Sequence, residues 1–257
     1  MMTAWIFSLT LLFASSALAA EDLRAFCDGL DKTLRHINRS ENRPCNAASL
    51  IPASARMARL EGQPVTVMSE ADAQKLFTEL KNNKDIPFEF SLAGCEQRAH
   101  EMARLLLLKG VTPLKGFASV DESKAPRLEI PHPRKKGQTI RWKYHVAPVV
   151  LVEKNGKLVP YTLDPSMEGK AVPTLQWKKD MTRHDPDMAV DLRFREASYY
   201  NESGTLKRDP RDPEFTKSNQ ESLREFKRYA QDPHGEEEWQ FQYELQEGKW
   251  NAADPGL

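Results

Sequence analysis

The feature that most constrains the fold is Asn155-Gly156, which lies between two runs of β-branched and aromatic residues. An Asn-Gly pair between two such runs predicts a β-hairpin with a two-residue turn. If these two residues form the loop, Lys154 pairs with Lys157. The chain is therefore expected to build an antiparallel sheet around residues 141–166.

The same register brings a histidine and a carboxylate together. Continuing the pairing away from the turn places Ala147 opposite Asp164, and His145 points to the same side of its strand as Ala147. His145 and Asp164 are then diagonal neighbours on one face of the hairpin, close enough for their side chains to meet. A bulge at Pro148 or Pro160 would shift this register, and a lone histidine in a strand is often a core residue.

A helix that opens at Gly94-Cys95 carries the strongest candidate for a reactive group. Gly110 supplies its C-terminal stop, and one stripe at helical spacing consists of Cys95, Ala99, Met102 and Leu106. Unpaired backbone N–H groups and the helix dipole stabilise a thiolate in the first turn, and the same amides can bind an oxyanion. Cys95 is therefore the candidate nucleophile, although a lone cysteine can also be a small buried hydrophobe. His100 projects from another side of the helix and is interpreted as a structural or surface residue.

The first twenty residues contain no charged side chain and are typical of a secretory signal peptide. Their apolar run is short for a membrane span, and Ala17 and Ala19 form an A-x-A signal for cleavage near Ala19/Ala20. We therefore expect an exported protein, either periplasmic or secreted. Because no Lys or Arg precedes the apolar run, an uncleaved anchor is the alternative.

Three cysteines, Cys27, Cys45 and Cys95, lie in the part that is expected to be exported, where an oxidising compartment favours disulfides. Cys27 and Cys45 flank a polar segment. A bond between them would close a loop of about 18 residues and stabilise the fold by on the order of 3 kcal/mol. We therefore expect a Cys27–Cys45 disulfide and a free thiol at Cys95.

Breaks in the pattern divide the chain into three parts. Residues 1–20 form the signal peptide, and residues 21–60 form a helix and loop or a short pro-region. Residues 61–257 form the catalytic domain, whose C-terminal part is polar and helical.

Shorter elements can be placed inside this domain. Ser69 with Asp72 predicts a capping box that opens a helix, and residues 111–120 are typical of a strand. Residues 121–138 are rich in Pro, Lys and Arg and are interpreted as an exposed loop. Residues 214–231 predict an amphipathic helix.

Composition excludes several classes of function. The 37 Lys and Arg residues balance the 37 Asp and Glu residues, so the chain lacks the basic excess that general nucleic-acid binding requires. It has no HExxH or CxxC motif, no glycine-rich phosphate loop and 6 scattered histidines, so no metal or other cofactor is expected. No later segment is apolar for long enough to cross a bilayer. We expect a monomer without stable membrane association.

Several blocks of sequence recur in the order that one known family shows. They are Ile86-Pro87-Phe88, Gly94 to Met102, Trp142 to Val146 and Leu163 to Ser166. Together they span roughly residues 85–170 and resemble the bacterial protein-glutaminase family.

The resemblance implies an α+β fold in which an antiparallel sheet packs against a helix with the nucleophilic cysteine at its N-terminus, as in transglutaminase-like and papain-like cores. It implies a secreted hydrolase without a cofactor. The substrates would be proteins or peptides bearing glutamine, whose side-chain amide is converted to a carboxylate with release of ammonia. By motif position, Cys95 would be the nucleophile, His145 the base and Asp164 the group that orients His145.

Substrate contacts and the exact reaction are less constrained. Trp142 and Tyr144 beside His145, with Ser166 at the end of the hairpin, are expected to bind substrate along a cleft open to an extended polypeptide. The same triad serves transglutaminases and cysteine proteases, which differ in the carbonyl attacked and in the acceptor of the acyl group. A non-enzymatic exported binding protein with a buried cysteine is a further alternative, and residues 170–257 carry no motif that decides between them.

Overall fold

The computed structural model describes residues 55–246, except residue 91 and residues 122–126. The predicted signal peptide and the predicted Cys27–Cys45 disulfide lie outside the described residues, as does most of the segment 21–60. Cys95 is a free thiol.

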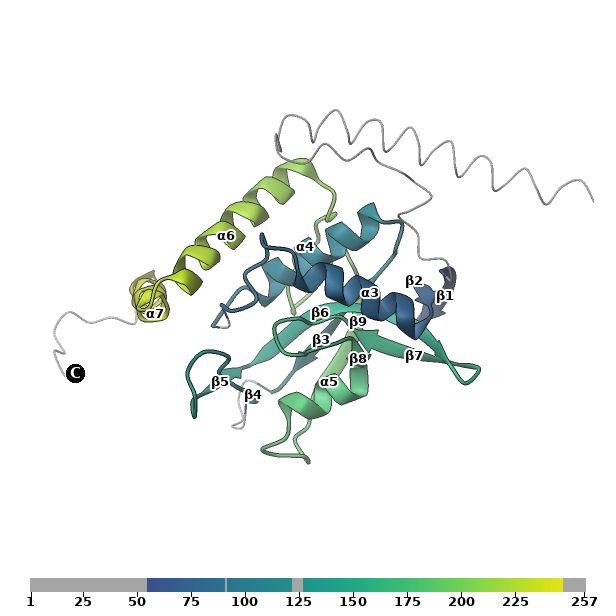
Figure 1. The fold of residues 1–257 in the computed structure, drawn as a ribbon, viewed down its shortest axis with the longest axis horizontal. Helices are drawn as coiled ribbons and strands as arrows, with labels where there is room; N and C mark the ends of the chain where they lie inside the picture. Colours follow the sequence, from purple (N-terminus) through teal and green to yellow (C-terminus); the bar gives the residue numbers. More distant parts are fainter. Residues whose placement is uncertain (1–54, 91, 122–126, 247–257) are drawn as a thin grey trace, which may run out of the picture. The chain divides into compact units, whose positions relative to one another are not determined.

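A seven-stranded sheet forms the centre of the fold (Figure 1). Its strands are β1 (Arg56–Leu60), β2 (Gln63–Met68), β3 (Leu114–Ser119), β6 (Tyr144–Lys154), β7 (Lys157–Thr162), β8 (Val172–Pro173) and β9 (Asp191–Glu196). The main order is β1-β2-β6-β3-β9, and β7 joins β6 to β8. The pairs are antiparallel except β2 with β6, which is parallel, so the sheet is mixed rather than purely antiparallel.

The described part of the chain contains five helices. They are α3 (Glu70–Lys81), α4 (Cys95–Leu108), α5 (Thr174–Met181), α6 (Pro213–Gln231) and α7 (Gly235–Gln246). Figure 1 shows α3 and α4 along one face of the sheet, with α6 beside α4 and α7 at the end of α6. The predicted α+β fold, with a sheet packed against a helix that begins at the cysteine, is confirmed.

The register of the predicted hairpin is also confirmed. Asn155 and Gly156 both have positive φ, 51° and 72°, as a two-residue hairpin turn requires. From this turn the pairing of β6 with β7 runs without a shift to Val149 opposite Thr162. The prolines in these strands therefore cause no bulge in this stretch.

Residues of β6 alternate between two packed faces. Val146 and Val150 lie in the clusters that include α3 and α4 side chains, whereas Ala147 and Leu151 belong to clusters without residues of these helices. His145 has the same parity as Ala147 and therefore starts on the face opposite α4. The base and the nucleophile thus approach each other at the end of the strand rather than across one face.

The helix α3 begins as the capping pattern predicts. The Asp72 N–H donates to the Ser69 side chain at 3.0 Å, which satisfies one of the free donors at the helix start. The buried stripe consists of Ala73, Leu76, Phe77 and Leu80, and it packs in the largest apolar cluster of the described residues.

The prediction that residues 121–138 form an exposed loop is wrong in part. A second, two-stranded sheet is formed by β4 (Leu128–Pro131) and β5 (Thr139–Trp142). Leu128 and Ile130 are buried, because their alternation directs both side chains to the same face. Prolines and basic residues on either side hide this short alternation in the sequence. His132, which lies within this segment, contacts Glu236 of α7 at 3.0 Å.

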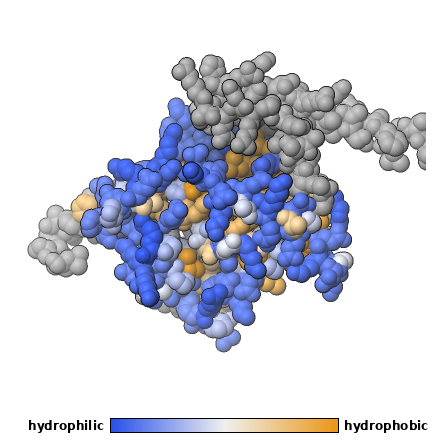
Figure 2. Space-filling model, in the orientation of Figure 1, coloured by the Kyte–Doolittle hydropathy of each residue, from blue (hydrophilic) through white to orange (hydrophobic). Residues whose placement is uncertain are grey.

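The surface is mainly polar on the face drawn in Figure 2, where apolar residues appear in small separate areas. Among the residues that the structure describes, no helix is both long enough and apolar enough to cross a bilayer.

Candidate active site

The carboxylate of Asp164 is buried and accepts hydrogen bonds on both oxygens. Its Oδ2 accepts from Nε2 of His145 at 2.8 Å and from Nε1 of Trp177 at 2.9 Å. Its Oδ1 accepts from the backbone N–H of Ser166 at 3.1 Å and from the Ser166 hydroxyl. Burial raises the pKa of Asp164, but the charge and hydrogen bond of His145, with those of Ser166 and Trp177, lower it below its ordinary value. Asp164 is therefore ionised at neutral pH.

The imidazole of His145 is equally buried, at 1% exposure. Burial lowers the pKa of His145, but the Asp164 charge and hydrogen bond, with the nearby Cys95 sulfur, raise it to about 9. His145 is thus a cation at neutral pH, paired with Asp164. Because Asp164 occupies Nε2, the remaining nitrogen for Cys95 is Nδ1, which is buried without a hydrogen-bond partner among the described residues.

Two indole rings fix the orientation of this imidazole. Trp142 stacks on His145 with ring centroids 4.7 Å apart and an angle of 10° between the planes. Trp177 lies tilted at 5.7 Å and also bonds to Asp164. The imidazole therefore has little freedom to rotate.

Cys95 is the first residue of α4, and its side chain is partly exposed. Gly94 precedes it with φ 82° and offers no side-chain cap to the first turn. Gly94 therefore leaves the backbone N–H groups of this turn without a side-chain acceptor at the N-cap position, and such groups can bind an anion. The thiol packs beside a small cluster formed by Ala99, Phe117, Val146 and Tyr199.

The loop before Cys95 is shaped by two contacts. The buried Arg98 donates through Nη1 to the carbonyl oxygens of Phe90 at 2.6 Å and Ala93 at 2.8 Å. A Cβ on Gly94 would lie 2.7 Å from the ring of Phe226 in α6, a separation that a real Cβ atom does not tolerate. The position of the nucleophile therefore depends on Arg98 and on a residue far along the chain.

A second group of buried polar residues lies next to the start of α4. Lys115 in β3 donates through Nζ to the carbonyl of Tyr199 at 2.7 Å and contacts Nδ1 of His100 at 3.1 Å. Burial lowers the pKa of Lys115 to about 7, against the opposing charge of Glu96. Burial and the Lys115 charge lower the pKa of His100 to about 3. His100 is therefore neutral and buried, a structural residue rather than a surface one.

The structure brings the predicted residues Cys95, His145 and Asp164 together. Of the three predicted substrate contacts, Trp142 stacks on His145 and Ser166 bonds to Asp164. Tyr144 lies near Cys95 and interacts with the Glu96 carboxyl, and burial raises the pKa of both groups.

Sequence reasoning missed Arg98, Lys115, Trp177 and Tyr199 as parts of the site. Arg98 lies inside a recognised block and could have been noticed there. The other three stand in stretches without a motif and reach the site only through tertiary pairing. No group of three or more His, Cys, Asp or Glu side chains in the described residues could hold a metal ion.

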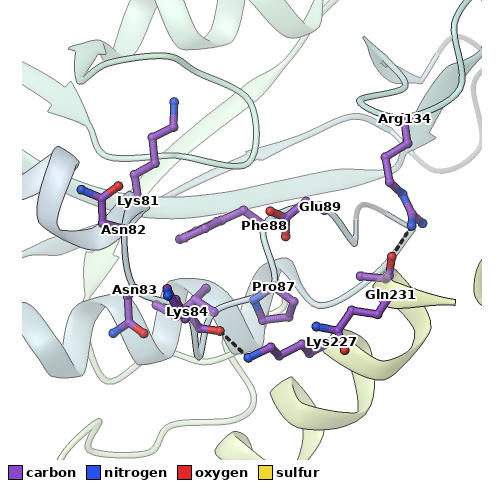
Figure 3. A pocket seen from close by; sticks show the side chains of 12 residues that line it. Lys81, Asn82, Asn83, Lys84, Pro87, Phe88, Glu89, Arg134, Lys227 and Gln231 are labelled. Carbon is purple, nitrogen blue, oxygen red and sulfur yellow. Dashed lines mark hydrogen bonds between the residues drawn. The ribbon is translucent and has the colours of Figure 1, made fainter.

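A groove with a volume of about 480 Å³ lies beside the loop that connects α3 to α4 (Figure 3). Its cationic lining residues are Lys81, Lys84, Arg134 and Lys227, and its one acidic lining residue is Glu89. Arg134 pairs with Glu236 at 2.6 Å, and Lys227 donates to the Lys84 carbonyl at 2.8 Å. Lys227 directly follows Phe226, whose ring lies against Gly94, but the groove lining contains none of Cys95, His145 and Asp164.

The family model described as Glutaminase matches residues 73–181, which include Cys95, His145 and Asp164. No curated protein sequence matches the chain. Among solved structures, the chain is similar to the crystal structure of pro-protein-glutaminase, with 20% identity, 74% of this chain and 63% of that chain covered, and a TM-score of 0.51. It is also similar to the NMR structure of protein-glutaminase from Chryseobacterium proteolyticum. That match has 22% identity, covers 60% of this chain and 85% of that chain, and has a TM-score of 0.48.

The similarity to the pro-form shows a shared fold, although the chain spans under two thirds of that structure. The matched segment 73–181 also contains all four sequence blocks that suggested the resemblance. Through this segment, which is less than half of the chain, the protein is similar to the family described as Glutaminase.

Proposed function

We propose that this protein hydrolyses the side-chain amide of glutamine residues in proteins, which yields glutamate and ammonia. The observation that carries the proposal is the contact between Asp164 and His145, at 2.8 Å, beside a cysteine at a helix N-terminus. Its occurrence inside the segment that matches the glutaminase family supports the choice of substrate amide.

In the first half of the proposed reaction, His145 holds the proton that leaves Cys95, and the thiolate attacks the carboxamide carbon of glutamine. A C–S bond forms while the carbonyl π electrons move to oxygen. Backbone N–H groups at the start of α4 stabilise this oxyanion. The C–N bond then breaks, His145 donates its proton to the leaving nitrogen, ammonia departs and a thioester remains.

In the second half, His145 takes a proton from water, which attacks the thioester carbonyl. The C–S bond breaks, glutamate leaves and the Cys95 thiolate with protonated His145 is restored. Asp164 keeps the imidazole in one orientation and stabilises its positive charge in both halves. The sum is one amide and one water converted to one carboxylic acid and one ammonia, which exchange a proton at neutral pH to give carboxylate and ammonium.

In this proposal the cationic groove, whose lining contains none of Cys95, His145 and Asp164, holds peptide that flanks the target glutamine of a protein substrate. Free glutamine lacks such flanking peptide and is expected to be a poor substrate. A protein that presents acidic residues near a glutamine would gain from the four cations of the groove.

We also propose that the enzyme acts as an exported monomer. The predicted cleavage near Ala19/Ala20 and the predicted Cys27–Cys45 disulfide are part of this proposal. N-terminal sequencing of the mature protein and non-reducing peptide mapping test both features.

The deciding experiment is intact mass spectrometry of a denatured glutamine-rich protein after incubation, with ammonia measured in parallel. Each event should add about one dalton and release one ammonia without cutting the backbone, as hydrolysis of an amide to an acid requires. Cys95→Ala should abolish both signals. Backbone fragments without ammonia would identify a protease, ammonia with covalent substrate dimers a transglutaminase, and an unchanged substrate would support a binding protein.

A further inference from the structure

A lysine without exposed surface lies beneath the start of the nucleophile helix. Lys115 is 0% exposed, and lysine is almost never buried unless it is paired, because removing an ammonium from water is costly. Its hydrogen-bond partners are the carbonyl of Tyr199 and the neutral ring of His100. No step of the proposed reaction uses Lys115, so its burial requires another explanation.

Its partner Tyr199 lies in the turn after β9 and packs against the same buried cluster as the nucleophile. The Tyr199 side chain packs in the same small cluster as Cys95, and both are partly exposed. Arg195 and Lys207 place their cationic groups 5.1 Å and 4.8 Å from the centre of the Tyr199 ring, which stabilises the ring where it stands. A partly exposed aromatic ring and a partly exposed thiol therefore pack against the same three buried residues, Ala99, Phe117 and Val146.

Two polar links connect the turn that carries Tyr199 to helix α4. The first is Lys115, which contacts the Tyr199 carbonyl and His100, a residue of α4. The second runs from the hydroxyl of Tyr200 to Oδ1 of Asn219 at 3.3 Å, and from Nδ2 of Asn219 to the carbonyl of Gln97 at 3.1 Å. The turn is thus fastened to the first turns of the helix that begins at Cys95.

We propose that the Tyr199 ring is one wall of the glutamine site, and that Lys115 is the positioning residue that keeps this wall beside Cys95. This inference rests on the proposed function and names how the site recognises the substrate side chain.

The chemistry of glutamine fits such a wall. Two methylene groups separate its backbone from the carboxamide, and they need an apolar surface at the entrance to a polar site. An aromatic ring beside the sulfur covers these methylenes, excludes water and directs the carboxamide carbon toward the thiolate. Asparagine is one methylene shorter and would make less of this contact, a difference of roughly fourfold in binding for one methylene.

The test uses the full-length enzyme and a short neutral peptide with one internal glutamine. Tyr199→Ala should raise KM about tenfold through lost packing, whereas Tyr199→Phe should stay within about twofold because it keeps the ring. Lys115→Met, which has a similar volume, should raise KM severalfold with a smaller change in kcat. Lys154→Met, at the far end of β6, is the matched lysine control and should behave as wild type.

A double variant makes the link between the two residues measurable. If Lys115 acts only through Tyr199, Lys115→Met should have no further effect on KM once Tyr199 is alanine. The rate of Cys95 alkylation by iodoacetamide should be unchanged in each variant, which shows that the nucleophile itself is intact. A lysine needed only for stability would lower the unfolding midpoint and leave the KM of the folded enzyme alone.

Each outcome decides the matter. If the wild type is active and Tyr199→Ala keeps its KM, the Tyr199 ring is not a wall of the glutamine site. If the effects on KM are additive in the double variant, Lys115 does not act by positioning Tyr199. Should Lys115→Met fail to fold, Tyr199→Ala against Tyr199→Phe still tests the wall. A wild type that releases no ammonia at all overturns the proposed function and this inference with it.

Discussion

The indole of Trp142 lies nearly parallel to the imidazole of His145, 4.7 Å away at 10°. Since Trp142 ends β5 and His145 lies near the start of β6, the sharp bend between these strands folds one ring onto the other. The stack leaves the imidazole in a single orientation, with Nε2 on Asp164 and Nδ1 free for the thiol.

Removing this stack should reduce turnover more than binding. Trp142→Ala is expected to lower kcat by about ten- to a hundredfold, because a small misplacement of a catalytic group has a cost of that order. Trp142→Phe keeps an aromatic ring and should retain most activity. Steady-state kinetics on a glutamine peptide would check this, and a change in KM alone would assign Trp142 to substrate binding instead.

Replacing the orienting carboxylate should be more damaging. Asp164→Asn keeps the size of the side chain but presents an amide to His145 and Trp177, so it favours the wrong imidazole tautomer. We expect a loss in kcat on the order of 10³- to 10⁴-fold. Circular dichroism should show an intact fold. A variant with near-normal kcat would rule out Asp164 as the orienting group.

Folding stability should depend on pH through two buried bases, His145 and Lys115, whose pKa values shift in opposite directions. The pKa of His145 is raised from 6.5 to about 9, so its stabilising contribution is complete below pH 6.5 and is lost as the pH rises through 9. The pKa of Lys115 is lowered from 10.5 to about 7. The folded state then binds fewer protons than the unfolded state between these values, and stability rises with pH. The two trends oppose each other between pH 7 and 9.

Lys115→Met should therefore reveal the His145 trend alone. Urea unfolding of this variant should show a free energy of unfolding that falls by on the order of 3 kcal/mol between pH 6.5 and 9. The wild type should change less over the same range, and His145→Gln should become more stable as the pH rises above 7. Equal slopes in all three proteins would contradict this assignment.

Gly94 should not accept any side chain. Its φ of 82° is left-handed, and a Cβ would lie 2.7 Å from the Phe226 ring. Gly94→Ala is expected to lose at least about 1–2 kcal/mol from the backbone alone and to reduce activity by displacing Cys95. Gly156→Ala, at a turn with open space around it, has the same backbone penalty without the clash and serves as the control. Equal activity losses in the two variants would count against the packing argument.

The cationic groove should affect acidic protein substrates only. Lys81→Glu combined with Lys84→Glu is expected to lower kcat/KM for an acidic glutamine-bearing protein by about tenfold at low salt, and the effect should shrink at higher ionic strength. Activity on a short neutral peptide should stay unchanged. Lys179→Glu, an exposed charge reversal on α5, is the control. An equal loss on both substrates would show that the groove does not select acidic partners.

The parts of this fold that depend on local patterns could be predicted from the sequence. The Asn155-Gly156 turn determines the register of β6 and β7, and this register brings His145 to Asp164. Gly94 before an amphipathic run predicts a helix that starts at Cys95. These features need only neighbouring residues, so a single sequence is enough to find them.

The parts that depend on distant segments could not be predicted. The parallel pairing of β2 with β6 and the Trp177 bond to Asp164 have no local signal. Lys115 lies in a strand of small and apolar residues, where its pattern gives no indication that the ammonium meets a carbonyl 84 positions later. Such contacts form only when distant segments pair in the folded sheet, so local propensity and residue spacing do not predict them.

The segment that matches the glutaminase family ends at residue 181, yet later residues complete the site. Strand β9 pairs along the whole of β3. The carbonyl of Tyr199 accepts a hydrogen bond from the Lys115 ammonium, and the ring of Phe226 in α6 lies against Gly94. A fragment trimmed to the matched residues would expose the edge of β3. It would also leave the buried Lys115 without the carbonyl of Tyr199. A shortened form that keeps these contacts must therefore extend through α6 and should be cut no earlier than residue 231.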